Sequence, residues 1–435
     1  MESLINKILL SITEDCYIQR YYLNKLFEFF KLQKYQFCYC EYYENRQYSL
    51  SLKAQDFYSK KIVAIVVKVS DVAFSQDKLQ LDKIYSIKYY CEKAEKYDNL
   101  IIQIFDFQRY LNLTKIFHYY EINSDNSYLV NNLQVKKSTF QIEFQDAVKL
   151  GQNISKCTNL SALQLDLDQT QIKCIAIQKI LCETSQCKQL EQLSLNLFKN
   201  QINLHSSKVI GFELTKFQNL KNLHLDLQNN MIEEHDFQWI AKGLKSLKLE
   251  SLSIFLFKNK ISDQGISHLG TALSSIIELQ NLLIVLRENK ITYQGLKEFS
   301  EGLQNCANLV NTQIYLSQNI LRNGLQYLGQ ALSKLKKLQY LQLNLRKTAN
   351  NDEGLNLLFQ GLSNCSQLLN LDIDYGKNLV SQGQTAKKIG KFLSKCSNLR
   401  TFKLKIDQNQ IDALIFRSMF KQTTKGKKLA EYYIS

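Results

Sequence analysis

Residues 249–306, LESLSIFLFKNKISDQGISHLGTALSSIIE followed by LQNLLIVLRENKITYQGLKEFSEGLQNC, contain one pattern twice, beginning at Leu249 and again at Leu279. Apolar residues first occupy every second position, which predicts a strand with one buried face. Apolar residues three or four apart follow, and they predict a helix that buries one stripe. An Asn separates the two parts, at Asn259 and at Asn289. The stretch therefore predicts two consecutive strand–turn–helix units.

The Asn position recurs along most of the chain, at intervals of 29 to 31 residues by subtraction of residue numbers. An Asn side chain offers two donors and an acceptor, so it can satisfy backbone groups that a tight buried bend leaves open. Two of the positions hold Thr170 and Thr348. The others hold Asn200, Asn230, Asn259, Asn289, Asn319, Asn378 and Asn409. We interpret these as structural residues of a continuous repeat array.

The pattern L-x-x-L-x-L-x-L-x-x-N-x-I, with Ile allowed at the Leu positions, resembles the leucine-rich repeat in its long, ribonuclease-inhibitor-like form. The resemblance covers about residues 130–420. It implies an α/β solenoid, a horseshoe with parallel strands on the concave face and helices outside. Val130, Leu133 and Val135 predict an atypical first strand, since terminal repeats cap the array. Ile411–Phe420 predicts a last helix, and residues 421–435 predict a basic, loosely ordered tail.

The first 129 residues lack this pattern and predict a small α+β region. Residues 1–50 predict helices, from apolar spacing such as that of Leu4, Ile8 and Ile12. Residues 51–129 predict a separate region with strands of its own. The domain boundaries expected from the sequence are therefore 1–50, 51–129, 130–420 and 421–435.

Residues 51–129 resemble a degenerate protein-kinase N-lobe. Lys61–Ser70 predicts a strand, and its Lys68 would stand for the Lys of the V-A-I-K motif. Leu79–Lys96 predicts the helix that follows this strand. Asp98–Ile101 would stand for the H-P-N-I segment after that helix, and Phe117–Asn123 predicts the strand before the hinge. The sequence has no Gly-rich loop in this stretch and no H-R-D, D-F-G or A-P-E motif. Phosphoryl transfer depends on those parts. The resemblance implies a vestigial lobe at most.

Composition and charge are those of an ordinary folded protein, with 45% apolar and 22% charged residues. The formal charge of +15 comes from Lys residues scattered over the predicted helices, without aromatic residues interleaved in a nucleic-acid motif. No apolar run approaches the roughly 18 residues of a membrane span, and residues 1–15 lack the features of a signal peptide. We expect a cytoplasmic protein that binds no nucleic acid.

The cysteines predict packing rather than metal or disulfide chemistry. Five lie three residues before a strand-opening Leu: Cys157, Cys187, Cys306, Cys365 and Cys396. Other repeats hold Phe217, Ser246, Ile276 and Leu335 at the same distance. A position shared by Cys, Phe, Ile and Leu is apolar, so we expect buried thiols at the helix ends. Cys38 and Cys40 lack the paired spacing of a zinc site, and we expect no metal.

Outward strand positions predict where a partner binds. In a horseshoe the non-Leu strand residues face the concave side. The middle repeats place aromatic, aliphatic and Arg residues there: Phe255, Phe257, Leu283, Val285, Arg287, Tyr315, Tyr340 and Arg346. Such residues dominate protein-binding hot spots. Acidic residues border them and could attract a basic region of the partner: Asp166, Asp168, Asp226, Asp372 and Asp374.

No catalytic residue, cofactor or small-molecule substrate is indicated. His224 and Asp226 project from one strand without a nucleophile, and no G-x-x-x-x-G-K-[ST] or G-x-G-x-x-G motif occurs. The sequence predicts a non-enzymatic scaffold or adaptor that binds a protein on the concave face. Two alternatives stay open, a kinase-like ATP-binding protein and a GTPase-regulating leucine-rich repeat protein.

Overall fold

The computed structural model describes residues 142–379 and 384–406, together with seven strands at 35–37, 47–56, 62–70, 84–91, 100–104, 132–137 and 431–434. The chain divides into two compact units. One comprises Met1–Leu100 and Phe105–Asn131, and the other comprises Ile101–Ile104 and Asn132–Ser435.

The described part of the first unit is a four-stranded antiparallel sheet in the order β1-β2-β3-β4. Its strands are β1 (Tyr35–Phe37), β2 (Gln47–Asp56), β3 (Ile62–Ser70) and β4 (Ile84–Cys91). The strand predicted around Lys68 is confirmed as β3.

Two helix predictions for this unit are wrong. Residues 84–91 form β4, not part of a helix over Leu79–Lys96, because IYSIKYYC is rich in Ile and Tyr and pairs with β3. Residues 35–37 and 47–50 belong to β1 and β2, so residues 1–50 are not helical throughout. Residues 1–34 and the strand predicted at Phe117–Asn123 lie outside the described residues.

The second unit is an α/β leucine-rich repeat solenoid built on one sheet in the order β16 to β5. The strands from β6 to β16 pair in parallel, each with the next in the chain. The strands of the whole sheet are β5 (Leu100–Ile104), β6 (Asn132–Lys137), β7 (Ala162–Asp166), β8 (Gln192–Asn196), β9 (Asn222–Asp226), β10 (Ser251–Phe255), β11 (Asn281–Val285), β12 (Asn311–Tyr315), β13 (Tyr340–Asn344), β14 (Asn370–Asp374), β15 (Thr401–Lys405) and β16 (Glu431–Ile434).

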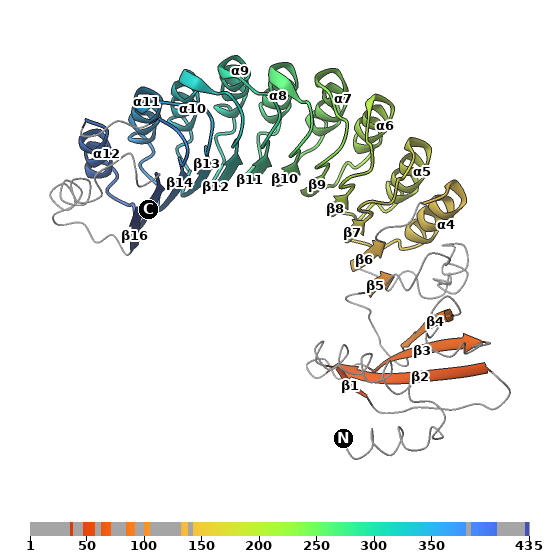
Figure 1. Ribbon diagram of the computed structural model, residues 1–435. Coiled ribbons are helices and arrows are strands. Elements are labelled where there is room, and N and C mark those ends of the chain that lie inside the picture. The colour runs from red at the N-terminus through yellow and green to blue at the C-terminus, as the bar shows by residue number, and fades with distance from the viewer. Residues whose placement is uncertain are drawn as a thin grey trace, which may run out of the picture. The chain divides into compact units, whose positions relative to one another are not determined.

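Helices alternate with these strands and lie on the opposite, outer side of the curved array (Figure 1). They are α4 (Phe144–Ser155), α5 (Cys174–Thr184), α6 (Leu204–Leu214), α7 (Glu234–Lys245), α8 (Ser262–Leu273), α9 (Tyr293–Leu303), the short 3₁₀ helix η3 (Arg322–Gly324), α10 (Leu325–Leu332), α11 (Asp352–Leu362) and α12 (Gln384–Lys395). Side chains cap the N-termini of three of these helices. Asn203, Thr292 and Asn351 each accept a hydrogen bond from a backbone N–H of the first turn.

The core lies between the sheet and the helices. In β10 the buried residues alternate with half-buried ones, and Leu252, Ile254 and Leu256 are fully buried. The helix α8 contributes Leu269 and Leu273 to the same core. The alternation predicted from the sequence therefore sets which strand face packs on the helices and which stays open.

The Asn or Thr position that recurs once in each repeat is here called the slot. The Asn side chains at the slots join consecutive repeats. Asn289 is fully buried, and its Nδ2 donates to the backbone carbonyls of Leu256 (2.8 Å) and Arg287 (3.1 Å). Its Oδ1 accepts from the backbone N–H of Ile261 at 3.3 Å. The bond to Leu256 crosses to the preceding repeat, so the Asn residues form a continuous polar line inside the solenoid.

The residue before each described slot has a positive φ. Lys258 has φ 53°, Glu288 has 56° and Gln318 has 60°. This left-handed turn ends the strand and directs the chain towards the helix. Only one repeat, at Asn229, uses a residue type that favours this conformation.

Two further predictions concern the residues at the ends of the helices. Cys157, Cys187, Cys306, Cys365 and Cys396 are buried thiols that form no disulfide with one another or with the other described cysteines, as expected. Leu247, not Ser246, occupies the equivalent position in its repeat: its N–H donates to the carbonyl of Leu244, and only Leu247 is buried. The connection there is one residue shorter than in neighbouring repeats.

The C-terminal tail contains a strand. Residues 431–434 form β16 and pair in parallel with β15, so the tail is not loosely ordered throughout. β16, not β15, is therefore the edge strand at this end of the described sheet. Asn409 and the helix predicted at Ile411–Phe420 lie outside the described residues.

Candidate functional site

The open face of the sheet carries three rows of outward side chains, defined by the strand register. The first row is Gln164, Ser194, His224, Ser253, Leu283, Gln313, Gln342, Asp372 and Lys403. The second row is Asp166, Asn196, Asp226, Phe255, Val285, Tyr315, Asn344, Asp374 and Lys405. The third row, two residues further along each chain segment, is Asp168, Phe198, Gln228, Phe257, Arg287, Ser317 and Arg346.

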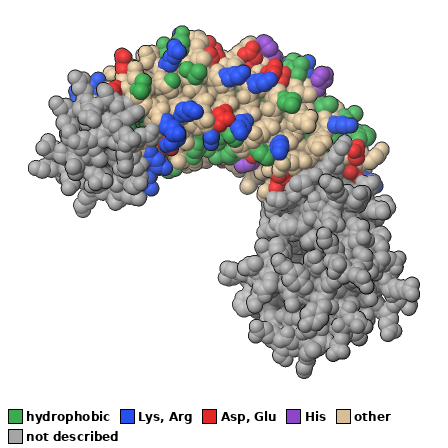
Figure 2. All heavy atoms as spheres, viewed as in Figure 1, with side chains coloured by type: hydrophobic (Ala, Val, Ile, Leu, Met, Phe, Trp, Pro, Cys, Tyr) green, Lys and Arg blue, Asp and Glu red, His purple; other side chains and the backbone are tan. Residues whose placement is uncertain are grey.

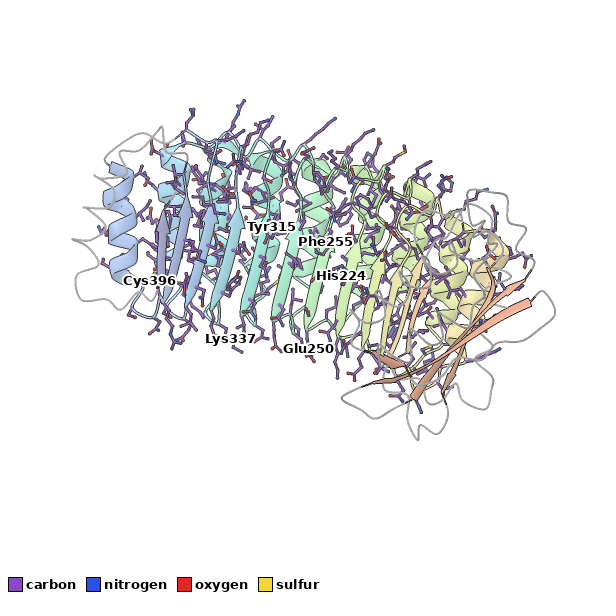
Figure 3. The ribbon with its side chains drawn as sticks, turned by 60° about the horizontal axis from the view of Figure 1, so that its bottom comes forward. His224, Glu250, Phe255, Tyr315, Lys337 and Cys396 are labelled. Carbon is purple, nitrogen blue, oxygen red and sulfur yellow. The ribbon has the colours of Figure 1, made fainter. Side chains whose placement is uncertain are left out.

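Apolar and aromatic side chains gather on three neighbouring strands, β10 to β12. We define the central patch as Phe255, Phe257, Leu283, Val285 and Tyr315, all of which are half-buried. The register places Phe255 opposite Val285, and Val285 opposite Tyr315. Figure 3 labels Phe255 and Tyr315 on this face of the sheet, with His224 beside them. The structure therefore brings together five of the eight partner-binding residues that the sequence indicates.

Phe255 is held by an aromatic neighbour on the preceding strand. The rings of His224 and Phe255 have centroids 4.9 Å apart and planes inclined by 43°. Burial lowers the pKa of His224, while Asp226 opposes that shift. Burial thus favours the neutral form of the imidazole, whose flat ring extends the patch.

Phe257 and Arg287 form the edge of the patch at the strand ends. The Arg287 guanidinium lies 5.0 Å from the Phe257 ring centroid, and the Lys258 ammonium lies 5.2 Å from it. Arg287 also donates from Nε to Gln318 Oε1 (2.5 Å) and forms an ion pair with Glu288 (3.2 Å). These contacts orient an exposed guanidinium over an aromatic face, where a partner can still reach it.

Tyr340 does not line up with Tyr315 across the strands. The register pairs Tyr315 with Asn344, and Tyr340 with Asn311 at the start of β12. Each hydroxyl donates to a Gln of the first row on its own strand: Tyr315 to Gln313 and Tyr340 to Gln342, both at 3.2 Å. Burial raises the pKa of both phenols, with further contributions from Asp372.

Arg346 lies in the third row on the far side of the patch. It is half-buried, and its backbone N–H donates to Asn344 Oδ1 at 3.2 Å. Sequence reasoning missed the first-row residues Ser253, Gln313 and Gln342 on these strands. Counting two residues back from Phe255, Tyr315 and Asn344 would have found them, since strand side chains alternate.

The acidic borders of the patch differ in their surroundings. Asp372 and Asp374 lie opposite Lys403 and Lys405 on the next strand, so their charge is partly offset. Burial raises the pKa of Asp372, and those two Lys residues oppose the shift.

At the other border, burial raises the pKa of Asp226, and Asp166 acts in the same direction. Asp226 accepts from the backbone N–H and from Nε2 of Gln228, both at 3.0 Å. Asn196 Nδ2 donates to Asp166 Oδ1 at 2.7 Å. The two carboxylates face the concave side with Asn196 between them, and this border is the more acidic one.

Catalytic geometry is not formed around His224 and Asp226. They lie two residues apart on β9 with no Ser or Cys side chain hydrogen-bonded to either among residues 142–379 and 384–406. In that part of the chain no group of three or more His, Cys, Asp or Glu side chains is arranged to hold a metal ion. None of the helices that the structure describes has the length and apolar character needed to cross a membrane.

Comparisons with known proteins give only distant likenesses. No protein-family model matches the sequence, and no curated protein matches it either. Among solved structures, internalin C2 from Listeria monocytogenes has a TM-score of 0.34 at 19% identity, over 59% of this chain and 84% of that one. The yeast Rad7 and Elc1 complex gives 0.38 at 16%, over 69% and 75%, and the mouse RP105/MD-1 complex gives 0.34 at 14%, over 78% and 63%. The fold is therefore described from the strand pairing and the helices of this chain.

Proposed function

We propose that the protein is a non-catalytic scaffold or adaptor that binds a protein partner on the concave face of its repeat array. The observation that carries this proposal is the central patch. Five half-buried apolar or aromatic side chains come from three adjacent strands of an open sheet face. Polar and charged rows surround them, which is the arrangement of an interface core with its rim.

The patch has the residue types and the rigidity that binding requires. Aromatic and Arg side chains in such cores often contribute about 2 kcal/mol or more each when removed. Strands lie about 4.8 Å apart, so β10 to β13 span roughly 15 Å. That distance suits the centre of an interface but not its whole area. The rows towards β7 and β14 supply the remaining contact surface.

Charge favours a partner with a basic segment near β7 to β9. Asp166 and Asp226 lie in the second row there, and Asp168 lies in the third. Asp372 and Asp374 face Lys403 and Lys405, so they contribute less attraction than the sequence alone indicates. Attraction of this kind raises the association rate more than the affinity, and salt weakens it.

Affinity capture from native cytosol tests the proposal. The wild-type chain, Phe255→Ala/Tyr315→Ala and Tyr293→Ala would be compared, with captured proteins quantified by mass spectrometry. Tyr293 is an exposed aromatic residue outside the central patch and serves as the matched control. We expect at least one protein to be captured by the wild type and the control but lost from the concave variant. An identical set of proteins on all three would contradict the proposal.

The two alternatives gain no support from the described residues. The kinase resemblance depended on a helix after Lys68, and β4 takes that position. No concave residue singles out a GTPase. The ribonuclease-inhibitor-like type of repeat and a cytoplasmic location belong to the proposal as well. A full helix in nearly every repeat supports the first, and buried free thiols, which suit a reducing compartment, support the second.

A further inference from the structure

The outer face of the solenoid carries two aromatic residues on neighbouring helices that the concave proposal does not use. Trp239, the single Trp of the chain, lies on α7 and is half-buried. Phe212 lies on the neighbouring helix α6, and 61% of its surface is exposed. Neither side chain belongs to the core between the helices and the sheet. Phe212 follows Gly211, where α6 packs closely against the backbone of Trp239 on α7, so both residues lie at the surface of one helix pair and add apolar surface outside the core.

Lysine ammonium groups lie over both rings. Lys208 on α6 is 5.2 Å from the Trp239 ring centroid, and Lys242 on α7 is 5.7 Å from it. Lys216 lies 4.8 Å from the ring centroid of Phe212. Such contacts keep the ammonium groups at the surface while their stems cover the rings. The cations are thus fixed next to apolar surface.

The net charge of this region is positive. Lys216 pairs with Glu213 at 2.7 Å, and the Glu213 side chain is 1% exposed, so that charge is neutralised. Lys208 and Lys242 are exposed and have no carboxylate within ion-pair distance in the described part of the chain. Two positive charges therefore flank Trp239 without compensation.

We propose that Phe212, Trp239, Lys208 and Lys242, here called the outer patch, bind an acidic segment of a protein partner that also carries an apolar side chain. Carboxylates of the segment pair with Lys208 and Lys242, and its apolar group packs on Phe212. The outer patch is on the opposite side of the solenoid from the central patch. This inference does not rest on concave binding.

The extent of the outer patch favours a peptide segment over a nucleic acid or a membrane. Neighbouring helices are about 8–10 Å apart, so α6 and α7 offer a small site. Further along the outer face α9 carries Glu298 and Glu301 beside Lys297. Figure 2 likewise shows basic and acidic side chains interspersed along the solenoid face in view. A long polyanion or an anionic bilayer needs a continuous basic face.

The test uses the full chain and a short peptide of alternating Glu and Leu. Fluorescence anisotropy of the labelled peptide measures binding, and emission of Trp239 reports whether binding occurs at the outer patch. We expect saturable binding with a change in Trp239 emission. Lys208→Gln/Lys242→Gln should weaken binding about tenfold, or about 1.4 kcal/mol. Lys297→Gln is the matched control, since Lys297 lies 5.7 Å from the Tyr327 ring outside the patch, and it should change the affinity less than about twofold.

Several outcomes would overturn the inference. Equal binding of a Gln/Leu peptide would show that charge is not recognised. Unchanged affinity in the double variant, or an equal loss in Lys297→Gln, would place binding elsewhere. Tighter binding of single-stranded oligothymidine or of phosphatidylserine vesicles would assign the patch to those ligands. The concave variant Phe255→Ala/Tyr315→Ala should bind the peptide as the wild type does, which separates this inference from the proposed function.

Discussion

At the scale of single residues, the slot Asn residues carry out the task that the sequence indicates. The Asn289 side chain donates a hydrogen bond to the carbonyl of Leu256 and accepts one from the N–H of Ile261. Both groups belong to the preceding repeat, so Asn289 links two repeats. Both backbone groups belong to buried residues, so both need a partner. Eight of the slots lie in the described residues, and every one of them is buried: Thr170, Asn200, Asn230, Asn259, Asn289, Asn319, Thr348 and Asn378.

Asn289→Ala should lower the free energy of unfolding by about 2–3 kcal/mol, because it leaves the buried N–H of Ile261 without its acceptor and removes one of the two side-chain hydrogen bonds to the carbonyl of Leu256, the other being from Asn259 at 3.1 Å. Asn308→Ala is the matched control. Asn308 Nδ2 also reaches the preceding repeat, at the carbonyl of Ile277, but at the solvent-exposed edge. Its loss should cost less than about 1 kcal/mol. Urea denaturation followed by circular dichroism measures both, and equal costs would contradict this role of the slot.

The buried thiols act as weak donors at helix ends. Cys306 Sγ donates to the carbonyl of Leu273 at 3.4 Å, and Cys365 Sγ donates to that of Leu332 at 3.3 Å. Burial raises the pKa of the Cys306 thiol from 9.0 to about 12. The folded state therefore keeps a proton that the unfolded state releases above pH 9, so this stabilisation is complete below pH 9 and is lost as the pH rises towards 12.

Native iodoacetamide labelling at pH 8, read by peptide mass spectrometry, should modify the half-buried Cys182 well before Cys306. In concentrated urea the two should react at similar rates. Cys306→Val should reduce the fall in unfolding free energy above pH 9, because it removes the titrating thiol. Rapid native labelling of Cys306 would show that its burial is wrong.

Some residue-scale features were not predictable. The left-handed turn residues include Lys258, Glu288, Gln318 and Lys347, and none of these types signals a positive φ. Their conformation is imposed by the strand before and the buried slot after them. The contribution of Ser253 and Gln313 to the concave face was also missed, since polar residues on a strand carry no distinctive signal. Counting from their apolar neighbours identifies them.

At the scale of elements, glycines set how closely helices pack. They occur in pairs at every second helix interface: Gly211 with Gly243, Gly270 with Gly302, and Gly329 with Gly361. A Cβ on Gly361 would lie 2.1 Å from the backbone oxygen of Gly329. Backbone cannot move aside as a flexible side chain can, so these positions exclude any larger residue. The sequence pattern of a single repeat does not show this alternation, because it spans two repeats.

Gly361→Ala should destabilise the protein by about 1–3 kcal/mol despite the better helix propensity of Ala. Gly354→Ala, in the same helix α11, is the matched control. There the nearest atom is the side-chain Oδ1 of Asn350 at 3.2 Å. We expect its stability to stay unchanged or rise by up to about 1 kcal/mol. Thermal unfolding of both variants decides the point, and equal behaviour would argue against the close helix contact.

Strands and helices of the repeat array could be predicted because the same pattern recurs in each repeat. In the array each strand, slot and helix occurs many times in register, so a local ambiguity is resolved by its neighbours in the sequence. The segment Ile84–Cys91 occurs once, and its apolar spacing fits a helix or a strand. The segment forms a strand because it pairs with β3. The kinase resemblance loses the helix that it required there.

At the scale of the whole molecule, the repeats form one coupled array. Leu256, which directly follows β10, is fully buried in the middle of the solenoid. Leu256→Ala should cost about 2–5 kcal/mol in urea unfolding, because it opens a cavity that neighbouring repeats share. An effect below roughly 0.5 kcal/mol, typical of surface positions, would contradict the register.

The open sheet face is the other property of the whole array, and its position could be predicted because period-two alternation leaves one strand face unburied. The partner could not be predicted, since residues on that face are free of packing constraints and differ from repeat to repeat. Binding therefore has to be measured on the face itself.

The most direct measurement is the affinity of a captured, purified partner for the wild-type chain and for Phe255→Ala/Tyr315→Ala, by isothermal titration calorimetry. Removal of two central side chains should weaken binding tenfold or more, at least about 1.4 kcal/mol, while circular dichroism shows an intact fold. Tyr293→Ala should bind as the wild type does. Affinity that survives the concave substitutions, and falls instead when Lys residues on the helix side are replaced by Gln, would contradict the account and place the site on the outer face.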